Sequence, residues 1–154
     1  MIIPFGIGGT LVESWSYGDL NLLTEYLFDN LKKINHNVDL FLFHQGEANS
    51  RFLKYQIKLS KNNYSESYLK NILKIVDQTR LYFPESYFGL SLVSKCGLQT
   101  NDFLINAQKE VINLRKKVFI SADSDSIFGE RYRYDKCHFT QEGIKELGKM
   151  YEES

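Results

Sequence analysis

Short apolar runs alternate along this chain with longer segments whose apolar residues recur at helical spacing. Four runs have the length and composition of buried strands: Ile2–Ile7, Val38–Phe43, Tyr87–Val93 and Val118–Ser121. Four segments carry apolar residues three or four positions apart, as on one face of a helix: Leu20–Ile34, Tyr64–Phe83, Asp102–Lys116 and Thr140–Tyr151. Strands that alternate with helices favour a parallel sheet with helices on both faces. The sequence therefore predicts a three-layer α/β/α domain with about four parallel strands.

Local signals mark the ends of several elements. Asp19 is placed to cap the first long helix, and Thr140 to cap the last. Pro84 stops the helix before it. The run Val38–Phe43, apolar except for Asp39, is typical of a strand covered on both faces. Lys54–Lys61 is expected to be a solvated loop or an insertion.

Composition and charge narrow the class of protein. The 154 residues suffice for one domain, and no linker or repeat divides them, so residues 1–154 are expected to form a single domain. Lys+Arg and Asp+Glu balance at 19 each, which gives no reason to expect a nucleic-acid or anionic-membrane partner. The apolar runs are too short to span a bilayer, and the start lacks the features of a signal peptide. A cytoplasmic location is therefore expected.

The two cysteines and the first residues add two expectations. Cys96 and Cys137 do not indicate the disulfide framework of a secreted protein, although one bridge stays open. Ile2–Ile7 resembles a core strand that runs directly into a glycine turn. A chain that opens inside a core strand is expected to lack an upstream segment.

Parallel α/β sheets place active sites beyond the carboxyl ends of their strands, and Asp135 and His138 follow the last predicted strand. They stand three positions apart in a loop before a capped helix. At this spacing a carboxylate can reach a ring nitrogen of the histidine, hold its tautomer and stabilise the imidazolium. The alternative is a surface aspartate beside a histidine that only caps or packs.

Phe43-His44-Gln45-Gly46-Glu47 follows the second predicted strand. The side-chain amide of Gln45 can point at a developing oxyanion, Gly46 permits a tight turn, and Glu47 can organise the loop. One alternative is a solvated turn. Another is a metal site built on His44 and Glu47, for which no third ligand follows at a clear spacing.

Gly8-Gly9-Thr10 ends the first predicted strand, and Trp15 follows. Backbone N–H groups in a glycine turn can also serve an oxyanion hole. A generic turn explains the same residues.

Together the three motifs resemble the SGNH hydrolase superfamily, and within it the sialate O-acetylesterase and acetyl-xylan-esterase-like carbohydrate esterases. The second block of that branch, G-G-T…W, is matched by Gly8-Gly9-Thr10…Trp15. The third block, W-H-Q-G-E, is matched from Phe43 to Glu47 with Phe in place of Trp. The last block, D-x-x-H, is matched by Asp135 and His138. The order and wide spacing agree from about Gly8 to the end of the chain.

The resemblance implies an SGNH or flavodoxin-like fold and a serine esterase that needs no cofactor and acts on an acylated carbohydrate or small ester. Gly9 would offer its backbone N–H to the oxyanion, and Gln45 its side-chain amide, with Glu47 beside them. Asp135 would orient His138, which would act as base towards serine and then as acid towards the leaving alcohol.

The first block of the family, a serine in a G-D-S or G-Q-S-N turn, has no match. Gly18-Asp19-Leu20 has leucine where serine is needed. Other nucleophilic side chains lie out of the family's order: Ser14, Ser16, Ser124, Ser126 and Cys96. The chain is therefore expected to begin one strand and one helix too late, and no nucleophile is identified. As encoded, it is expected to be weak or inactive.

Three functions stay open from the sequence. The first is an O-acetyl esterase, and the second is a carbohydrate O-acyltransferase that uses the same residues. The third is a non-catalytic remnant that binds a glycan or a partner chain. Arg131-Tyr132-Arg133 can contact an acidic sugar, but the segment is expected to be an ordinary surface loop.

Overall fold

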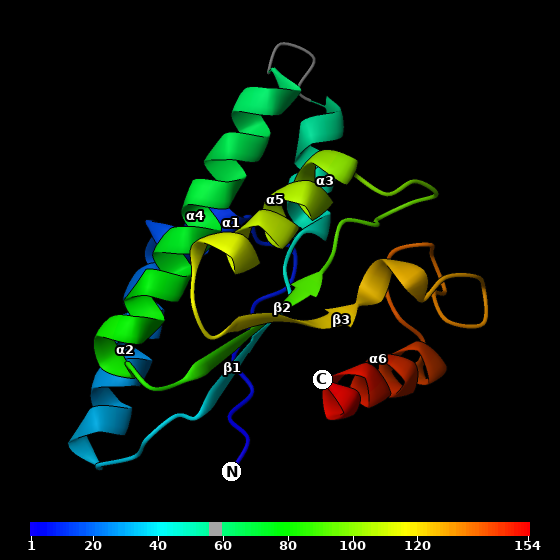
Figure 1. Ribbon diagram of the computed structural model, residues 1–154. Helices are drawn as coiled ribbons and strands as arrows, with labels where there is room; N and C mark the ends of the chain where they lie inside the picture. The colour runs from blue at the N-terminus through cyan, green and yellow to red at the C-terminus, as the bar shows by residue number, and fades with distance from the viewer. Residues whose placement is uncertain (56–59) are drawn as a thin grey trace.

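The computed structural model describes residues 1–55 and 60–154, which form an α/β domain (Figure 1). Its sheet holds three parallel strands, in the order β1 (Leu40–Phe43), β2 (Tyr87–Leu92) and β3 (Val118–Asp123). The helices of the described residues are α1 (Val12–Ser16), α2 (Asp19–Lys33), α3 (Glu47–Tyr55), α4 (Lys61–Tyr82), α5 (Asp102–Leu114), the 3₁₀ turn η1 (Ser124–Ser126) and α6 (Gln141–Glu153). All strands therefore end at one edge of the sheet, where the predicted site motifs follow them.

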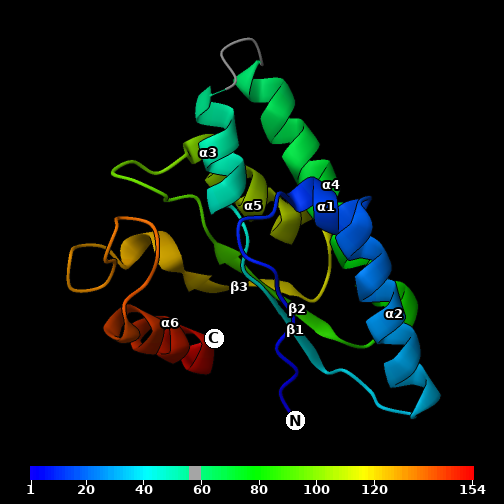
Figure 2. The ribbon, with the colours of Figure 1, turned by 180° about the vertical axis from the view of Figure 1, so that it is seen from behind.

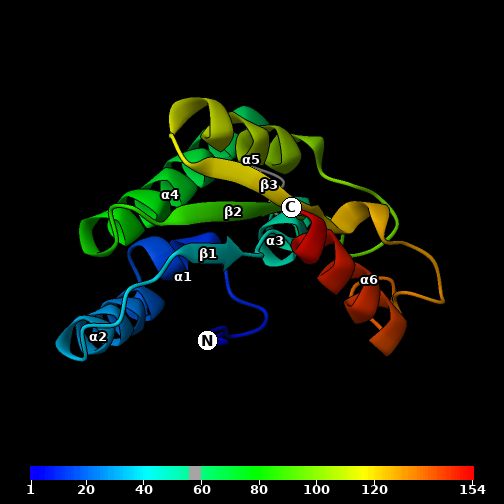
Figure 3. The same ribbon diagram turned by 60° about the horizontal axis from the view of Figure 1, so that its bottom comes forward.

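Helices cover both faces of the sheet (Figure 3). α4 and α5 pack against one face, and α6 packs against β3 on the other. The main core lies between α4, α5 and β2, where alternate strand residues Phe88 and Leu90 point into it. Apolar residues one or two turns apart on the helices complete this core: Ile72 and Val76 from α4, and Leu104 and Val111 from α5. The three-layer α/β/α architecture predicted from the sequence is confirmed, with three strands in the described residues where about four were predicted.

The predicted first strand, Ile2–Ile7, is not a strand. The segment runs as irregular chain beside β1 (Figure 2), and its side chains are largely exposed, Ile2 to 92%. A groove of about 950 Å³ lies between this segment, α2 and β1. The apolar sequence lines this groove and forms no backbone ladder with β1. Apolar composition alone therefore did not settle strand pairing.

β1 is also less covered than predicted. Leu40 and Leu42 are exposed to 45% and 47%, on the face where α6 lies over β3 and leaves β1 bare. In the described part of the chain, β1 pairs with β2 alone. Both the outer edge and one face of β1 are thus open.

Most predicted helix ends agree with the structure. Thr140 caps α6, with its hydroxyl accepting from the N–H of Gly143, and α4 ends just before Pro84. Asp19 is the first residue of α2 and not its cap, which is Gly18, but its carboxylate still lies at the positive end of the helix. α3 was not predicted, and it takes in the first two residues of the loop expected over Lys54–Lys61. Residues 56–59 of that loop lie outside the described residues.

Gly46 lies where β1 leads into α3, and it allows the exit of β1 to touch the exit of β2. A Cβ at this position would stand 1.7 Å from the carbonyl oxygen of Val93. The fully buried Gln108 seals the contact, because its amide accepts from the Val93 N–H and donates to the Val93 carbonyl. Gly46 has no left-handed backbone. The glycine is therefore needed for close approach, not for the tight turn that the sequence suggested.

We expect Gly46→Ala to lower the free energy of unfolding by about 1–3 kcal/mol, as overpacking a filled interior does. Gly148→Ala is the matched control, because nothing lies within 4 Å of its added methyl group on α6. There, alanine should raise the free energy of unfolding by about 0.5–1 kcal/mol. Urea denaturation followed by circular dichroism measures both. A neutral Gly46→Ala would contradict the close contact.

Candidate active site

Asp135 and His138 lie on a loop between η1 and α6 that folds back on itself. The loop closes where Arg133 and Phe139 pair as an isolated antiparallel bridge. Inside the bridge, the N–H of Tyr134 donates to the His138 carbonyl at 3.1 Å. This closure brings the aspartate and the histidine to opposite sides of one narrow turn.

The two side chains form a direct hydrogen bond. Asp135 Oδ2 lies 2.6 Å from His138 Nδ1, and Asp135 Oδ1 accepts from the backbone N–H of His138 at 2.7 Å and of Cys137 at 3.0 Å. An ionised carboxylate only accepts, so Nδ1 carries the proton of this bond, and in the neutral ring the lone pair is on Nε2. The Tyr134 ring stacks on the imidazole, with centroids 5.8 Å apart. The loop thus holds the imidazole in one orientation.

The ionised state of Asp135 favours its hydrogen bond with His138. The backbone N–H of His138, followed by its ring, lowers the pKa of Asp135 to about 2. The carboxylate therefore stays ionised through the neutral range, where it can stabilise an imidazolium. The His138 side chain is 66% exposed, and no hydroxyl among the described residues forms a hydrogen bond with its Nε2. The imidazole therefore faces solvent.

The second motif, Phe43–Glu47, contacts the loop that carries Asp135 and His138 (the dyad loop) through the side chain of His44. Its ring packs edge-on against Phe139, with centroids 6.3 Å apart. His44 Nε2 lies 3.3 Å from the carboxylate of Glu47, and Nδ1 lies 3.0 Å from the hydroxyl of Tyr151 on α6. Burial would raise the pKa of Glu47, but the hydrogen bond and charge of His44 outweigh it, and the pKa is lowered. Glu47 is therefore an ionised group that orients His44.

Gln45 is buried, and its amide is engaged inside the protein. Its Nε2 donates to the Thr10 carbonyl at 3.1 Å and to Asn49 Oδ1, while Oε1 accepts from Tyr68 at 3.2 Å. An amide has two N–H donors, and both are engaged here. The oxyanion role of Gln45 stays a prediction, and it requires the release of one of these bonds.

The third motif, Gly8-Gly9-Thr10 with Trp15, forms a turn closed by hydrogen bonds of its own residues. The Thr10 hydroxyl donates to the Ile7 carbonyl at 2.8 Å and accepts from Trp15 Nε1 at 2.9 Å. Gly9 has φ +73°, a conformation that favours glycine, and it is exposed. The Thr10 carbonyl ties this turn to Gln45. The structure therefore joins the third motif to the second, and the second to the dyad loop. Whether Gly9 serves an oxyanion stays a prediction.

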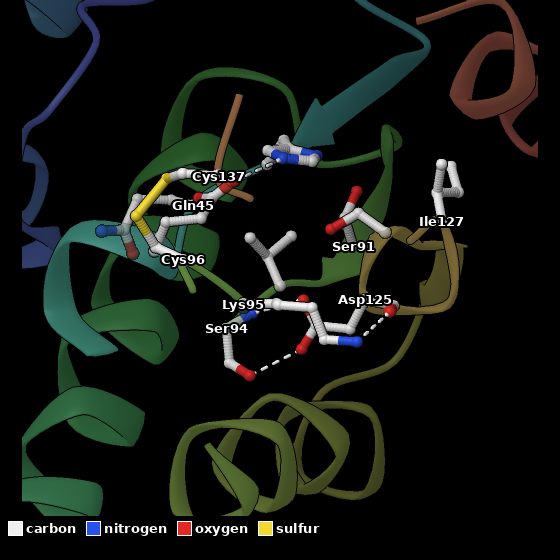
Figure 4. Close-up of polar contacts among 12 residues, drawn as sticks. Gln45, Ser91, Ser94, Lys95, Cys96, Asp125, Ile127 and Cys137 are labelled. Atoms are coloured by element: carbon white, nitrogen blue, oxygen red, sulfur yellow. Dashed lines mark hydrogen bonds and ion pairs between the residues drawn. A yellow bond between two sulfur atoms is a disulfide. The ribbon is translucent and has the colours of Figure 1, made fainter. Parts of the chain in front are cut away.

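Asp125 and Arg133 bind backbone groups of the loops at the carboxyl edge of the sheet, and the sequence did not single them out for that role. Asp125, in η1, accepts from the N–H groups of Ser94 and Lys95 at 3.0 and 2.8 Å and from the Ser94 hydroxyl at 2.6 Å (Figure 4). Arg133 is 1% exposed, so its predicted place on a surface loop is wrong. Arg131 does lie on the surface, paired with Glu142. No sequence signal separates the two arginines, because only tertiary contacts bury one of them.

Cys96 and Cys137 form a disulfide that joins the loop after β2 to the dyad loop (Figure 4). Beside it, the N–H of Gly97 donates to the Lys136 carbonyl at 3.0 Å. Cys96 is therefore not a free nucleophile, which corrects that candidate. The single bridge that the sequence left open is present.

His44 and Glu47 gain no third ligand. Across residues 1–55 and 60–154, no three side chains of His, Cys, Asp or Glu gather as a metal site requires. In the same part of the chain, no helix combines the length and apolarity needed to cross a membrane.

A parallel α/β/α domain with an Asp–His pair beyond the carboxyl edge of its sheet is the arrangement that the SGNH resemblance implies. A sequence model of the family described as carbohydrate esterase, sialic acid-specific acetylesterase, matches residues 1–154. The chain belongs to this family, which confirms the resemblance carried by its three motifs. No curated protein matches the chain.

We expect the Asp135 carboxyl to titrate near the value of about 2 that its hydrogen bonds impose. In His138→Ala, the midpoint should rise but stay below the ordinary value, because the two backbone N–H donors remain. NMR titration of the side-chain carboxyl carbon measures both. An ordinary midpoint in the native protein would contradict the described turn. The native turn gains stability from the carboxylate above the ordinary aspartate pKa and loses it as the pH falls towards 2.

We expect removal of the disulfide to lower the free energy of unfolding by about 4 kcal/mol, the chain-entropy estimate for a loop of this length. The two cysteines are 41 positions apart in the sequence. The variant carries Cys96→Ser and Cys137→Ser, and urea denaturation measures it against the oxidised chain. Native protein in reductant serves as the control and should match the variant. Equal stability of the oxidised and reduced chains would show that the bond does not form.

Proposed function

We propose that the chain hydrolyses O-acetyl esters on a carbohydrate, with Asp135 and His138 as the acid–base pair of a serine mechanism. The family is one of carbohydrate acetylesterases, which supports O-deacetylation in general. One observation carries the proposal: the 2.6 Å bond from Asp135 to His138 Nδ1, which leaves Nε2 free to take a proton.

The proposed chemistry follows from that pair. As a serine oxygen attacks the acetyl carbon, its proton passes to His138 Nε2, and Asp135 stabilises the resulting imidazolium. The imidazolium then gives its proton to the leaving sugar oxygen, and an acetyl-serine remains. Water attacks this ester with the same base, which releases acetate and restores the serine.

We place the serine on a strand added to the open edge of β1. The groove along β1 and the unpaired edge support this position. A further parallel strand there would end at the same sheet edge as β1, whose last residue, Phe43, leads into His44 and Gln45. A serine in the turn after that strand would approach the site from the side of the second motif.

The test compares this chain with a form extended at its N-terminus by a strand and a G-D-S turn. The chain alone should release no acetate through His138. The extended form should do so, and His138→Ala should lower its turnover by at least about 10²–10⁴-fold. His36→Asn is the control, because this histidine precedes β1 at the opposite edge of the sheet. No His138-dependent turnover with the serine in place would refute the esterase.

Product analysis distinguishes the other functions. Transfer of the acetyl group to an added acceptor sugar would assign a carbohydrate O-acyltransferase. Glycan binding by the extended form without turnover would assign a non-catalytic binding protein.

The disulfide bears on where the chain works. Disulfides persist in oxidising compartments and are rare in the cytosol. The Cys96–Cys137 bond therefore supports an oxidising compartment over the cytoplasmic location expected from the sequence.

A further inference from the structure

Arg133 is among the largest fully buried side chains of the described residues, and its guanidinium is surrounded by carbonyl groups. Nε donates to Ile127 at 2.9 Å, and Nη2 donates to Ser124 at 2.7 Å. Nη1 donates to Lys95 at 3.3 Å and to Cys137. These acceptors belong to the loop after β2, the segment after β3 and the dyad loop. One side chain thus joins three loops at the carboxyl edge of the sheet.

A contribution to stability alone does not explain why an arginine is buried at position 133. Removing a guanidinium from water is costly, and a well-packed apolar side chain often replaces a buried charge without loss. No carboxylate of the described residues forms a direct ion pair with Arg133. The charges of nearby acidic groups, Glu47 first, offset only part of the cost of burial, which lowers the pKa of the guanidinium. Its fork of donors does, however, set the geometry of several carbonyls at once.

One of the carbonyls that Arg133 holds lies next to His138, the proposed base. Arg133 binds Cys137, directly before His138, and its guanidinium lies 4.0 Å from the ring centroid of Phe139, directly after it. The N–H of Cys137 is bound by Asp135, and its sulfur by Cys96. The backbone on both sides of His138 is therefore fixed from within the protein.

His138 needs such support because its own side chain has little. It is 66% exposed, and its ring contacts are the hydrogen bond to Asp135 and the stacked Tyr134. Both partners lie on the same short loop. A shift of the backbone at Cys137 or Phe139 would therefore move the whole pair relative to anything bound in front of it.

We propose that Arg133 is a positioning residue for the Asp135–His138 pair. It touches neither substrate nor nucleophile and acts through the backbone of Cys137 and the ring of Phe139. As a role in catalysis, this rests on the proposed esterase function. As a role in holding His138, it does not.

The test uses Arg133→Lys, with Arg131→Lys as the matched control. Lysine keeps the charge, but a single ammonium cannot hold carbonyls of three segments in the same geometry. Arg131 is two positions away, is 72% exposed and binds no loop carbonyl through its side chain. The disulfide still ties Cys137 to Cys96 in Arg133→Lys, which favours a folded variant.

NMR of the histidine rings in the full chain gives the first readout. In the native protein, His138 should show one tautomer with a solvent-protected Nδ1 proton. Arg133→Lys should shift the His138 ring signals and speed exchange of that proton, while Arg131→Lys leaves both unchanged. The second readout is turnover in the serine-bearing extended form. There, Arg133→Lys should lower kcat on the order of 100-fold with KM little changed, as a misplacement of about 1 Å does.

Unchanged His138 signals in a folded but less stable Arg133→Lys would overturn the proposal, because the arginine would then be only structural. Equal effects from Arg131→Lys would also overturn it. If the native extended form shows no turnover, the esterase fails, while the NMR readout still decides the positioning role. If Arg133→Lys does not fold, Phe139→Leu removes the ring contact without burying an unpaired group, and it must shift the His138 signals in the same direction.

Discussion

Backbone polar groups buried at the carboxyl ends of the strands are the constraint on which this structure depends. Such groups need partners, because an unpaired one costs as much as a lost hydrogen bond. Three buried side chains supply them. Gln108 binds both polar groups of Val93 where β1 and β2 leave the sheet, Asp125 binds the N–H groups after β2, and Arg133 binds the carbonyls after β3. Gln108 and Asp125 thereby hold the exit of β2, and Arg133 holds the segment after β3.

This arrangement explains how an exposed dyad can be well oriented. The bond between Asp135 and His138 is local, and both side chains face solvent. Its loop, however, is anchored to the interior by Arg133 and by the disulfide at Cys137. Orientation therefore comes from the buried side of the loop, and access from the other side. An acid–base pair that must meet a substrate needs both properties.

The sequence predicted the layers, the helices and the dyad, because each depends on residues close together in the chain. Apolar spacing identified α2, α4, α5 and α6, and the three-position spacing of Asp135 and His138 allowed their hydrogen bond. Ile2–Ile7 failed as a strand because pairing requires a partner in register, which composition does not specify. Gly46 was predicted to permit a tight turn, but its role is close contact with Val93, 47 positions further along the chain.

By itself, the sequence determined the α/β class, the family and the spacing that lets Asp135 bind His138, since periodicity and short motifs are properties of neighbouring residues. Only the tertiary structure decided that Cys96 meets Cys137, that Arg133 is buried while Arg131 is exposed, and that the amide of Gln45 is engaged. These outcomes depend on which distant segments share one edge of the sheet. The same local chemistry at Arg131 and Arg133 led to opposite environments for that reason.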